Sequence, residues 1–226
     1  MKKTNFNSYH YSIPSEVVIE AYKKGLFPMA ETANSKEIYW LEPKKRGVFF
    51  FDKIKVPKKL RKIAKKFPFK IVVDNNFEGV IENCSKITNL RKDTWINDTI
   101  KNIYFEMYKK GYAHSVECYL DNKLVGGLYG IVIGAVFFGE SMFSSVTNAS
   151  KFALFHLIER LIVGQFTFID AQFINNHLIQ FGAEEISCQF FKKILREGVN
   201  KKGNFEKISS IGVVPNNIYP LTSNII

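Results

Sequence analysis

Residues 113–139 read AHSVECYLDNKLVGGLYGIVIGAVFFG. The apolar runs on either side of Asp121-Asn122-Lys123 predict a β-hairpin with strands at 114–120 and 124–133. A further apolar run at 135–139 predicts a third strand. The glycines of the second run do not form the G-x-G-x-x-G motif of dinucleotide-binding proteins, so we interpret them as sites of close packing within a strand.

The sequence after this run alternates between helix and strand. Residues 148–163 are largely apolar and are followed by Gly164, which predicts a long helix. A strand is predicted at 166–170, and helices are predicted near 173–181 and 188–197. Antiparallel strands followed by a helix, a strand and further helices predict an α+β fold.

The N-terminal part of the chain has a different character. Residues 1–13 are polar and aromatic and predict an irregular arm. The elements predicted after it are a helix at 15–24, an apolar turn at 25–29, a strand at 48–51 and a helix at 58–66. Because the pattern changes near residue 70, we predict a small N-terminal α/β domain at 1–68 and a larger C-terminal domain at 69–226.

The composition is that of a globular protein with a basic surface. Of 226 residues, 46% are hydrophobic and 23% are charged, which excludes disordered and collagen-like classes. A net charge of +11 favours a polyanionic partner such as nucleic acid. Three separated cysteines, no secretory signal and no long apolar run predict a cytoplasmic protein. Because the histidines lack metal-ligand spacing, no metal is expected.

The helix predicted at 58–66 is apolar on one face and basic on the other. Leu60, Ile63 and Ala64 share the apolar face. The basic face carries Lys58, Lys59, Arg61, Lys62, Lys65 and Lys66. Such a face is either solvated or contacts phosphates, and the pattern alone does not separate the two interpretations.

Carboxylates follow two of the predicted strands. Glu140 follows the strand at 135–139, and Asp170 ends the strand at 166–170, with Gln172 close behind. If the strands are neighbours, two carboxylates meet at one site of a basic protein, which suits a cationic substrate beside a polyanionic one. The polar residues Ser144 and Asn148 lead into the long helix, where capping is the alternative interpretation.

Several segments together are similar to those of one enzyme family. They are 21–29, Trp40 with Pro43 and Arg46, 94–96, 111–117, 124–130, 138–144, 148–151, 169–172, and His177-Leu178 with Gly182-Ala183. In this order they resemble the leucyl/phenylalanyl-tRNA–protein transferases. The resemblance implies transfer of Leu or Phe, sometimes Met, from aminoacyl-tRNA to the α-amine of proteins that begin with Arg or Lys. It also implies N-end rule degradation, an acetyltransferase-like (GNAT-like) C-terminal domain, no metal or coenzyme, and we expect a monomer.

The resemblance also assigns roles to individual residues. Asp170 and Gln172 match positions proposed to relay a proton; we interpret Gln172 as a positioning group and Asp170 as its electrostatic support. Glu140 is expected to orient the incoming N-terminus or the terminal adenosine. The expected aminoacyl pocket comprises Leu128, Phe137, Met142, Leu157 and Ile169. The expected residues for the tRNA 3′ end and the acceptor are Tyr22, Met29, Trp95, Tyr104, Ser144 and Asn148, and the basic helix at 58–66 is expected to contact the tRNA backbone.

Other activities remain open from sequence. One is the same transfer to acidic N-termini. Another is a coenzyme A-dependent N-acetyltransferase, although the segment 144–149 lacks the glycines of a pyrophosphate loop. A third is a catalytically idle RNA-binding protein, against which the presence of Glu140, Asp170 and Gln172 argues.

Overall fold

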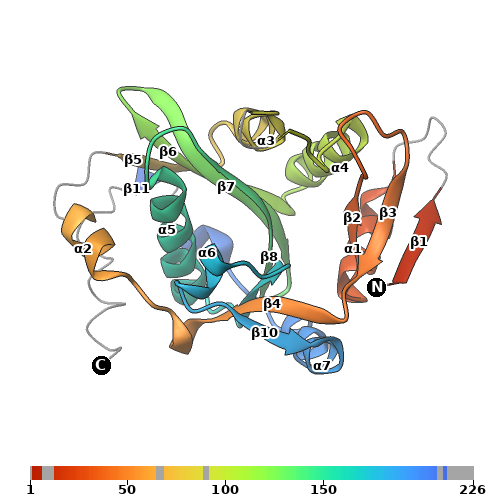
Figure 1. Ribbon diagram of the computed structural model, residues 1–226. Helices are drawn as coiled ribbons and strands as arrows, with labels where there is room; N and C mark the ends of the chain where they lie inside the picture. The colour runs from red at the N-terminus through yellow and green to blue at the C-terminus, as the bar shows by residue number, and fades with distance from the viewer. Residues whose placement is uncertain (1, 7–12, 65–68, 89–91, 208–210, 213–226) are drawn as a thin grey trace.

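The computed structural model describes residues 2–6, 13–64, 69–88, 92–207 and 211–212, which form two β-sheets and the helices around them (Figure 1). The larger sheet has the strand order β10-β4-β9-β8-β7-β6-β5-β11, and the smaller sheet has the order β1-β3-β2. All pairs are antiparallel except β8 and β9, which run parallel. The predicted α+β class is confirmed.

The elements have the following bounds. The strands are β1 (Lys2–Phe6), β2 (Phe27–Met29), β3 (Ile38–Glu42), β4 (Lys45–Phe50), β5 (Lys70–Val73), β6 (Ala113–Leu120), β7 (Lys123–Ile133), β8 (Val136–Ser144), β9 (Phe168–Gln172), β10 (Glu184–Ser187) and β11 (Ile211–Gly212). The helices are α1 (Ser15–Lys23), α2 (Lys58–Ala64), α3 (Phe77–Ser85), α4 (Asp98–Lys109), α5 (Ala149–Val163), α6 (Asn176–Ile179) and α7 (Cys188–Val199). Short 3-10 turns lie at η1 (Phe51–Lys53) and η2 (Phe205–Lys207).

The hairpin predicted from 113–139 forms the centre of the larger sheet. Helix α5 covers one face of β6, β7 and β8, and α3 and α4 cover the other face (Figure 1). Gly126 permits this packing because a Cβ atom there would lie 2.5 Å from the Cβ of Ala149 at the start of α5. The crossover from β8 through α5 to β9 places Phe138 beside Asp170 in the parallel pair.

Two apolar clusters fill the space on either side of the larger sheet. The first lies under α5 and includes Leu60 and Ala64 of α2, so the apolar face predicted for that helix is confirmed there. The second lies under α1, α3, α4 and α7 and also contains residues of β2 and β3. The small sheet and the large sheet therefore share one core.

Several predicted boundaries were wrong. Residues 2–6, predicted as irregular, form β1, and the predicted turn at 25–29 contains β2. Strand β8 continues to Ser144, so Glu140 lies inside the strand and not after its end. The domain boundary after residue 68 stays a prediction; β4, which precedes it, lies in the larger sheet between β10 and β9. None of the described helices combines the length and the apolar character needed to cross a bilayer.

Candidate active site

A cavity of about 350 Å³ opens between α5 and strands β7, β8 and β9. All five residues expected to form an aminoacyl pocket line it: Leu128, Phe137, Met142, Leu157 and Ile169. The register explains this grouping, because Leu128 pairs with Met142 and Phe137 pairs with Ile169 across neighbouring strands. The structure thus brings these five side chains together around one apolar space.

The cavity has further walls that sequence reasoning did not assign to it. These are Phe49 of β4, Leu154 of α5, and Phe173, Asn175, His177 and Leu178 in and before α6. Met29 and Trp95, both expected near the tRNA 3′ end, also line the cavity. The position of Phe173 directly after Gln172, just beyond a strand end, was the available signal, since ligands gather beyond strand ends in open sheets.

Glu140 lies at the wall of the cavity and is hydrogen-bonded by three side chains. Its Oε1 accepts from Tyr22 Oη at 2.7 Å and from Gln172 Nε2 at 3.0 Å, and its Oε2 forms a hydrogen bond with Tyr104 Oη at 2.6 Å. Burial raises the pKa of Glu140 to about 7, although the hydrogen bonds with these three side chains lower the pKa and the charge of Asp170 raises it further. This carboxyl group can therefore hold or release a proton near neutral pH.

Asp170 lies behind this network in a buried ion pair with Arg46. Arg46 Nε donates to Asp170 Oδ1 at 2.8 Å, and Arg46 Nη2 donates to Oδ2 at 2.6 Å. The remaining guanidinium nitrogen, Arg46 Nη1, donates to the carbonyl of Gly25 at 2.9 Å. Asp170 Oδ1 also accepts the backbone N–H of Gln172 at 2.9 Å, which fixes Gln172 at a φ of 60°. Asp170 does not line the cavity; it contacts Gln172, which does.

The other four expected 3′-end residues divide into two groups. Tyr22 and Tyr104 belong to the Glu140 network, as described above. Ser144 Oγ donates to the carbonyl of Val146 at 2.8 Å and accepts the N–H of Ser150 at 3.2 Å. Asn148 has a φ of 73°, and its Oδ1 accepts from Lys151 at 2.9 Å. The Ser144 contact matches the capping interpretation, whereas the Asn148 side chain caps no backbone N–H group of α5. A role at the tRNA 3′ end stays a prediction for Ser144 and Asn148.

The basic face of α2 is open to solvent. Lys58, Lys59 and Lys62 are exposed, whereas Arg61 is partly buried and donates through Nε to the carbonyl of Val56 at 3.1 Å. Lys65 and Lys66 lie outside the described residues. In Figure 1, α2 lies at the side of the molecule opposite the small sheet. Phosphate contact by this face stays a prediction.

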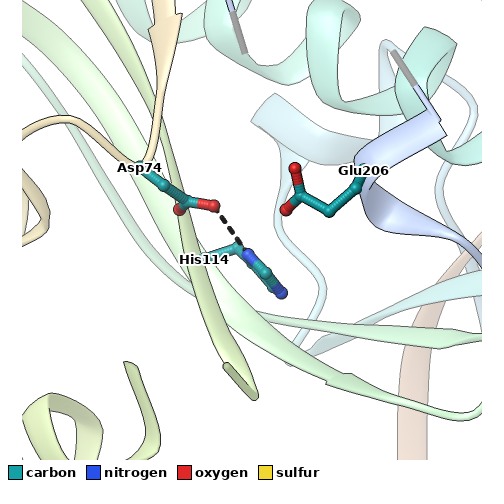
Figure 2. Close-up of side chains that lie close together, drawn as sticks. All are labelled: Asp74, His114 and Glu206. Atoms are coloured by element: carbon teal, nitrogen blue, oxygen red, sulfur yellow. Dashed lines mark hydrogen bonds and ion pairs between the residues drawn. The ribbon is translucent and has the colours of Figure 1, made fainter. Parts of the chain in front are cut away.

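A second group of titratable side chains lies away from the cavity. Figure 2 shows Asp74, His114 and Glu206 facing one another, with Asp74 Oδ2 2.7 Å from His114 Nδ1. Asp74 Oδ1 also accepts the N–H of Ser115 at 2.7 Å. The charges of Glu206 and Asp74 oppose the lowering of the pKa of Arg160 by burial, so a cation already lies near both carboxylates. We therefore interpret this cluster as a charge-balanced structural contact between β6 and η2.

A mainly apolar cavity bordered by a buried, titratable carboxyl group is typical of an enzyme with a substrate pocket for an apolar group. A family model described as leucyl/phenylalanyl-tRNA protein transferase matches residues 48–196, and the model of its N-terminal domain matches residues 12–44. The chain therefore belongs to the leucyl/phenylalanyl-tRNA protein transferase family, and it is an aminoacyltransferase. The family expected from the sequence motifs is confirmed.

Individual relatives support this assignment. A leucyl/phenylalanyl-tRNA–protein transferase of Zymomonas mobilis subsp. mobilis is 46% identical over 188 residues, which cover 83% of this chain and 70% of the relative. The enzyme of the same name from Caulobacter vibrioides is 43% identical over 188 residues, covering 83% of this chain and 87% of the relative. That of Paramagnetospirillum magneticum is 41% identical over 199 residues, covering 88% and 95%.

Proposed function

We propose that this chain transfers leucine or phenylalanine, and sometimes methionine, from aminoacyl-tRNA to the α-amine of proteins that begin with Arg or Lys. The observation that carries the proposal is the cavity of about 350 Å³, whose lining is mainly apolar, with Glu140 and Gln172 at one polar edge and Ser141, Asn175 and His177 as its other polar residues. An apolar side chain fits such a space without a specific polar partner. Because an apolar pocket discriminates weakly between side chains that differ by one methylene, mixed donor specificity is expected.

The polar edge is where the two substrates would meet. Aminolysis of the aminoacyl ester needs a neutral amine and stabilisation of the charge that develops on the carbonyl oxygen. Asp170 is paired with Arg46, so Glu140 is the carboxyl group that faces the cavity. A cationic N-terminus suits this edge. Alignment of the amine and the ester here contributes several kcal/mol to the lowering of the barrier (~7 kcal/mol for good alignment).

Gln172 and Asp170 have supporting roles in this proposal. An amide is a poor base, so Gln172 positions Glu140 and the substrates through its Nε2, and Asp170 supports Gln172 through the backbone N–H. Arg46 in turn fixes both oxygens of Asp170. The order of contacts, from Arg46 to Asp170 to Gln172 to Glu140, makes the ion pair a positioning device.

The proposal extends to the rest of the molecule. The exposed lysines of α2 would contact tRNA phosphates, since a basic face without acids attracts a polyanion. We assign an acetyltransferase-like architecture to the catalytic domain at 69–226, which the β8–α5–β9 crossover supports. We also propose that the enzyme is a monomer, that it is cytoplasmic, and that it acts in N-end rule degradation.

The test is transfer of labelled Leu, Phe and Met from charged tRNA to peptides that begin with Arg, Lys, Asp, Glu or Ala. Label on the Arg and Lys peptides alone is the expected result. Label on the Asp or Glu peptides would mean that the acceptor proteins begin with an acidic residue and not with a basic one. Absence of label from every peptide, while charged tRNA still binds, would overturn the proposed activity.

A further inference from the structure

Three oxygen atoms form a closed triangle beside the cavity. Tyr22 Oη lies 2.7 Å from Glu140 Oε1, Tyr104 Oη lies 2.6 Å from Glu140 Oε2, and the two Oη atoms lie 2.8 Å apart. Each of these distances is that of an O–H···O hydrogen bond. Tyr22 and Tyr104 are fully buried, and Glu140 is 9% exposed.

The number of protons available decides the protonation state of this triangle. Each tyrosine hydroxyl has one proton to donate, and a carboxylate has none. If Glu140 is ionised, two protons serve three contacts, and one pair of oxygens faces each other without a hydrogen between them. If Glu140 carries a proton, each of the three contacts has one.

We propose that Glu140 is a carboxylic acid in the substrate-free enzyme and closes a ring of three hydrogen bonds with Tyr22 and Tyr104. The contact from Gln172 sets the direction of the ring. Because Oε1 accepts from both Gln172 Nε2 and Tyr22, it is the carbonyl oxygen, and Oε2 carries the proton. Glu140 then donates to Tyr104, Tyr104 donates to Tyr22, and Tyr22 donates back to Oε1.

Glu117, another buried glutamate, has hydrogen-bond contacts that do not require a proton on its carboxyl group. Glu117 is 0% exposed and accepts from the N–H groups of Asn75 and Asn76 and from the hydroxyls of Ser115 and Tyr119. All four donors bring their own proton, so no contact at Glu117 requires one from the carboxyl group. The proton requirement at Glu140 comes from the contact between the two tyrosines, which Glu117 lacks.

The groups packed around the ring act in both directions: hydrogen bonds with Tyr22, Tyr104 and Gln172 lower the pKa of Glu140, and the charge of Asp170 raises it. They come from α1 (Tyr22), α4 (Tyr104), β7 (Tyr129) and β9 (Asp170 and Gln172), and Arg46 pairs with Asp170. Burial is the main cause that raises the pKa of Glu140 to about 7, and burial together with the Glu140 charge raises the pKa values of both ring tyrosines. Release of the ring proton is therefore a titration of Glu140 near neutral pH.

The ring gives Glu140 a defined part in the reaction; this step rests on the proposed function. Once ionised, Glu140 lacks one proton of the ring and takes it from the acceptor α-ammonium, which becomes a neutral amine. The amine nitrogen forms a bond to the ester carbonyl carbon, and the bond from that carbon to the tRNA 3′ oxygen breaks. A second nitrogen proton goes to the 3′ oxygen, the third stays on the amide, and Glu140 returns its proton to solvent.

The protonation state is measured on the substrate-free protein by infrared difference spectroscopy, with Glu140→Gln subtracted from wild type. We expect a carboxylic acid C=O band that is present below about pH 7 and lost above it. Tyr22→Phe should move the band to higher frequency, because the carbonyl oxygen loses a donor. The matched control Tyr119→Phe, which removes a donor from Glu117, should leave the band in place.

Two results would overturn the ring. One is the absence of a Glu140 band at every pH above about 4.5, the ordinary pKa of a glutamate. The other is a band that Tyr22→Phe leaves unmoved. Because this measurement uses neither tRNA nor acceptor, its failure is separate from failure of the proposed transfer.

The pH profile of transfer tests the catalytic step. If Glu140 must be ionised and the amine protonated, kcat/KM for an Arg peptide rises up to about pH 7 and falls above the amine pKa of about 8. Glu140→Gln should lack the fall and follow ionisation of the amine alone. A wild-type profile that rises through the amine pKa and stays high, as in the variant, would overturn the role of Glu140 as the base.

Discussion

Arg46 shows how a single side chain can join distant parts of this enzyme. Its guanidinium carbon lies 4.6 Å from the ring centroid of Phe27 and 4.5 Å from that of Phe191, while its nitrogens contact Gly25 and Asp170. Only a planar group with several donors can stack on two rings and bind a carboxylate through two bonds. Lysine at this position would keep the charge but lose this geometry.

We therefore predict that Arg46→Lys lowers the free energy of unfolding by about 2–4 kcal/mol and slows transfer by at least about tenfold. Urea unfolding and transfer to an Arg peptide measure the two effects. In Arg46→Ala, added guanidinium should restore part of the transfer, and methylammonium should not. The matched control Lys53→Met removes an exposed pair with Glu184 and should change stability by less than about 1 kcal/mol. Equal stability of Arg46→Lys and wild type would contradict the prediction.

The raised pKa of Glu140 also predicts how the free energy of unfolding depends on pH. Its pKa is raised from an ordinary 4.5 to about 7, so the folded state binds the proton more tightly than the unfolded state. This contribution is complete below about pH 4.5 and is lost as the pH rises through about 7. The loss amounts to about 3 kcal/mol. Glu140→Gln should remove it, which urea unfolding at a series of pH values measures; an unchanged slope would contradict the raised pKa.

Sequence reasoning at this scale named Glu140, Asp170 and Gln172 but gave none of their contacts. Arg46 and Asp170 are 124 positions apart, and Tyr22 and Glu140 are 118 apart. Hydrophobic periodicity carries no information on such pairs, because they depend on the pairing of β4 with β9 and on how α1 packs against the sheet. Phe173 was missed for a related reason: the apolar pattern at 173–181 indicated a helix, whereas α6 begins only at Asn176.

At the scale of an element, α5 contains a histidine with no evident polar role. His156 is 2% exposed, and within the described part of the chain neither ring nitrogen has a hydrogen-bond partner. Burial, with a smaller contribution from the charge of Arg160, lowers the pKa of His156 to about 4. The folded state therefore keeps the ring neutral, and its stability falls as the pH drops from about 6.5 through 4.

His156→Leu should therefore raise the free energy of unfolding by about 1–3 kcal/mol at neutral pH, because it removes an unsatisfied buried polar group. The gain should grow toward pH 4, where wild type must bury a ring that favours protonation. Urea unfolding at several pH values measures both effects. Since the Glu140 contribution has the opposite sign between about pH 4.5 and 6.5, the comparison belongs in the Glu140→Gln background. If His156→Leu lowers the free energy of unfolding both at neutral pH and near pH 4, the prediction is contradicted.

The exposed lysines of α2 allow a prediction of how tRNA binding depends on salt concentration. Lys59 and Lys62 are exposed, so Lys59→Glu with Lys62→Glu should weaken tRNA binding and reduce the slope of log K against log salt by about 1–2. Binding titrations over a range of salt concentrations measure the slope. Lys109→Glu on α4, another exposed position, is the control. An unchanged slope in the α2 variant would return this face to the solvated interpretation.

The elements that the sequence predicted are the long or strongly patterned ones. The hairpin at 113–133 and helix α5 have apolar runs that few other structures can accommodate. Strands β2 and β10 were missed because they have only 3 and 4 residues, too few for an alternating pattern to appear. Their existence depends on a partner strand, β3 for β2 and β4 for β10, which periodicity cannot identify.

For the whole molecule, the small sheet and the large sheet share one apolar cluster. Tyr22, Phe27 and Trp40 of the N-terminal part pack in the same cluster as Tyr104 and Phe138 of the catalytic part. The Arg46–Asp170 pair and the Glu140 network lie at this junction. Separation of the two parts would therefore expose buried apolar surface and break buried hydrogen bonds at the same time.

This shared core predicts that the described parts of the chain unfold together. The protein has two tryptophans, and Trp95→Phe leaves Trp40 of β3 as the only one, so tryptophan fluorescence then reports on the small sheet. In urea, its fluorescence transition should coincide with the loss of far-ultraviolet circular dichroism, which reports all helices and strands. Phe27→Ala leaves a cavity in the shared cluster and should lower the urea midpoints of both signals equally. The free energy of unfolding should fall by about 3–5 kcal/mol. A fluorescence transition that precedes the dichroism would show instead that residues 1–68 unfold as an independent domain, and the active-site contacts from Tyr22 and Arg46 would then form only when that domain docks.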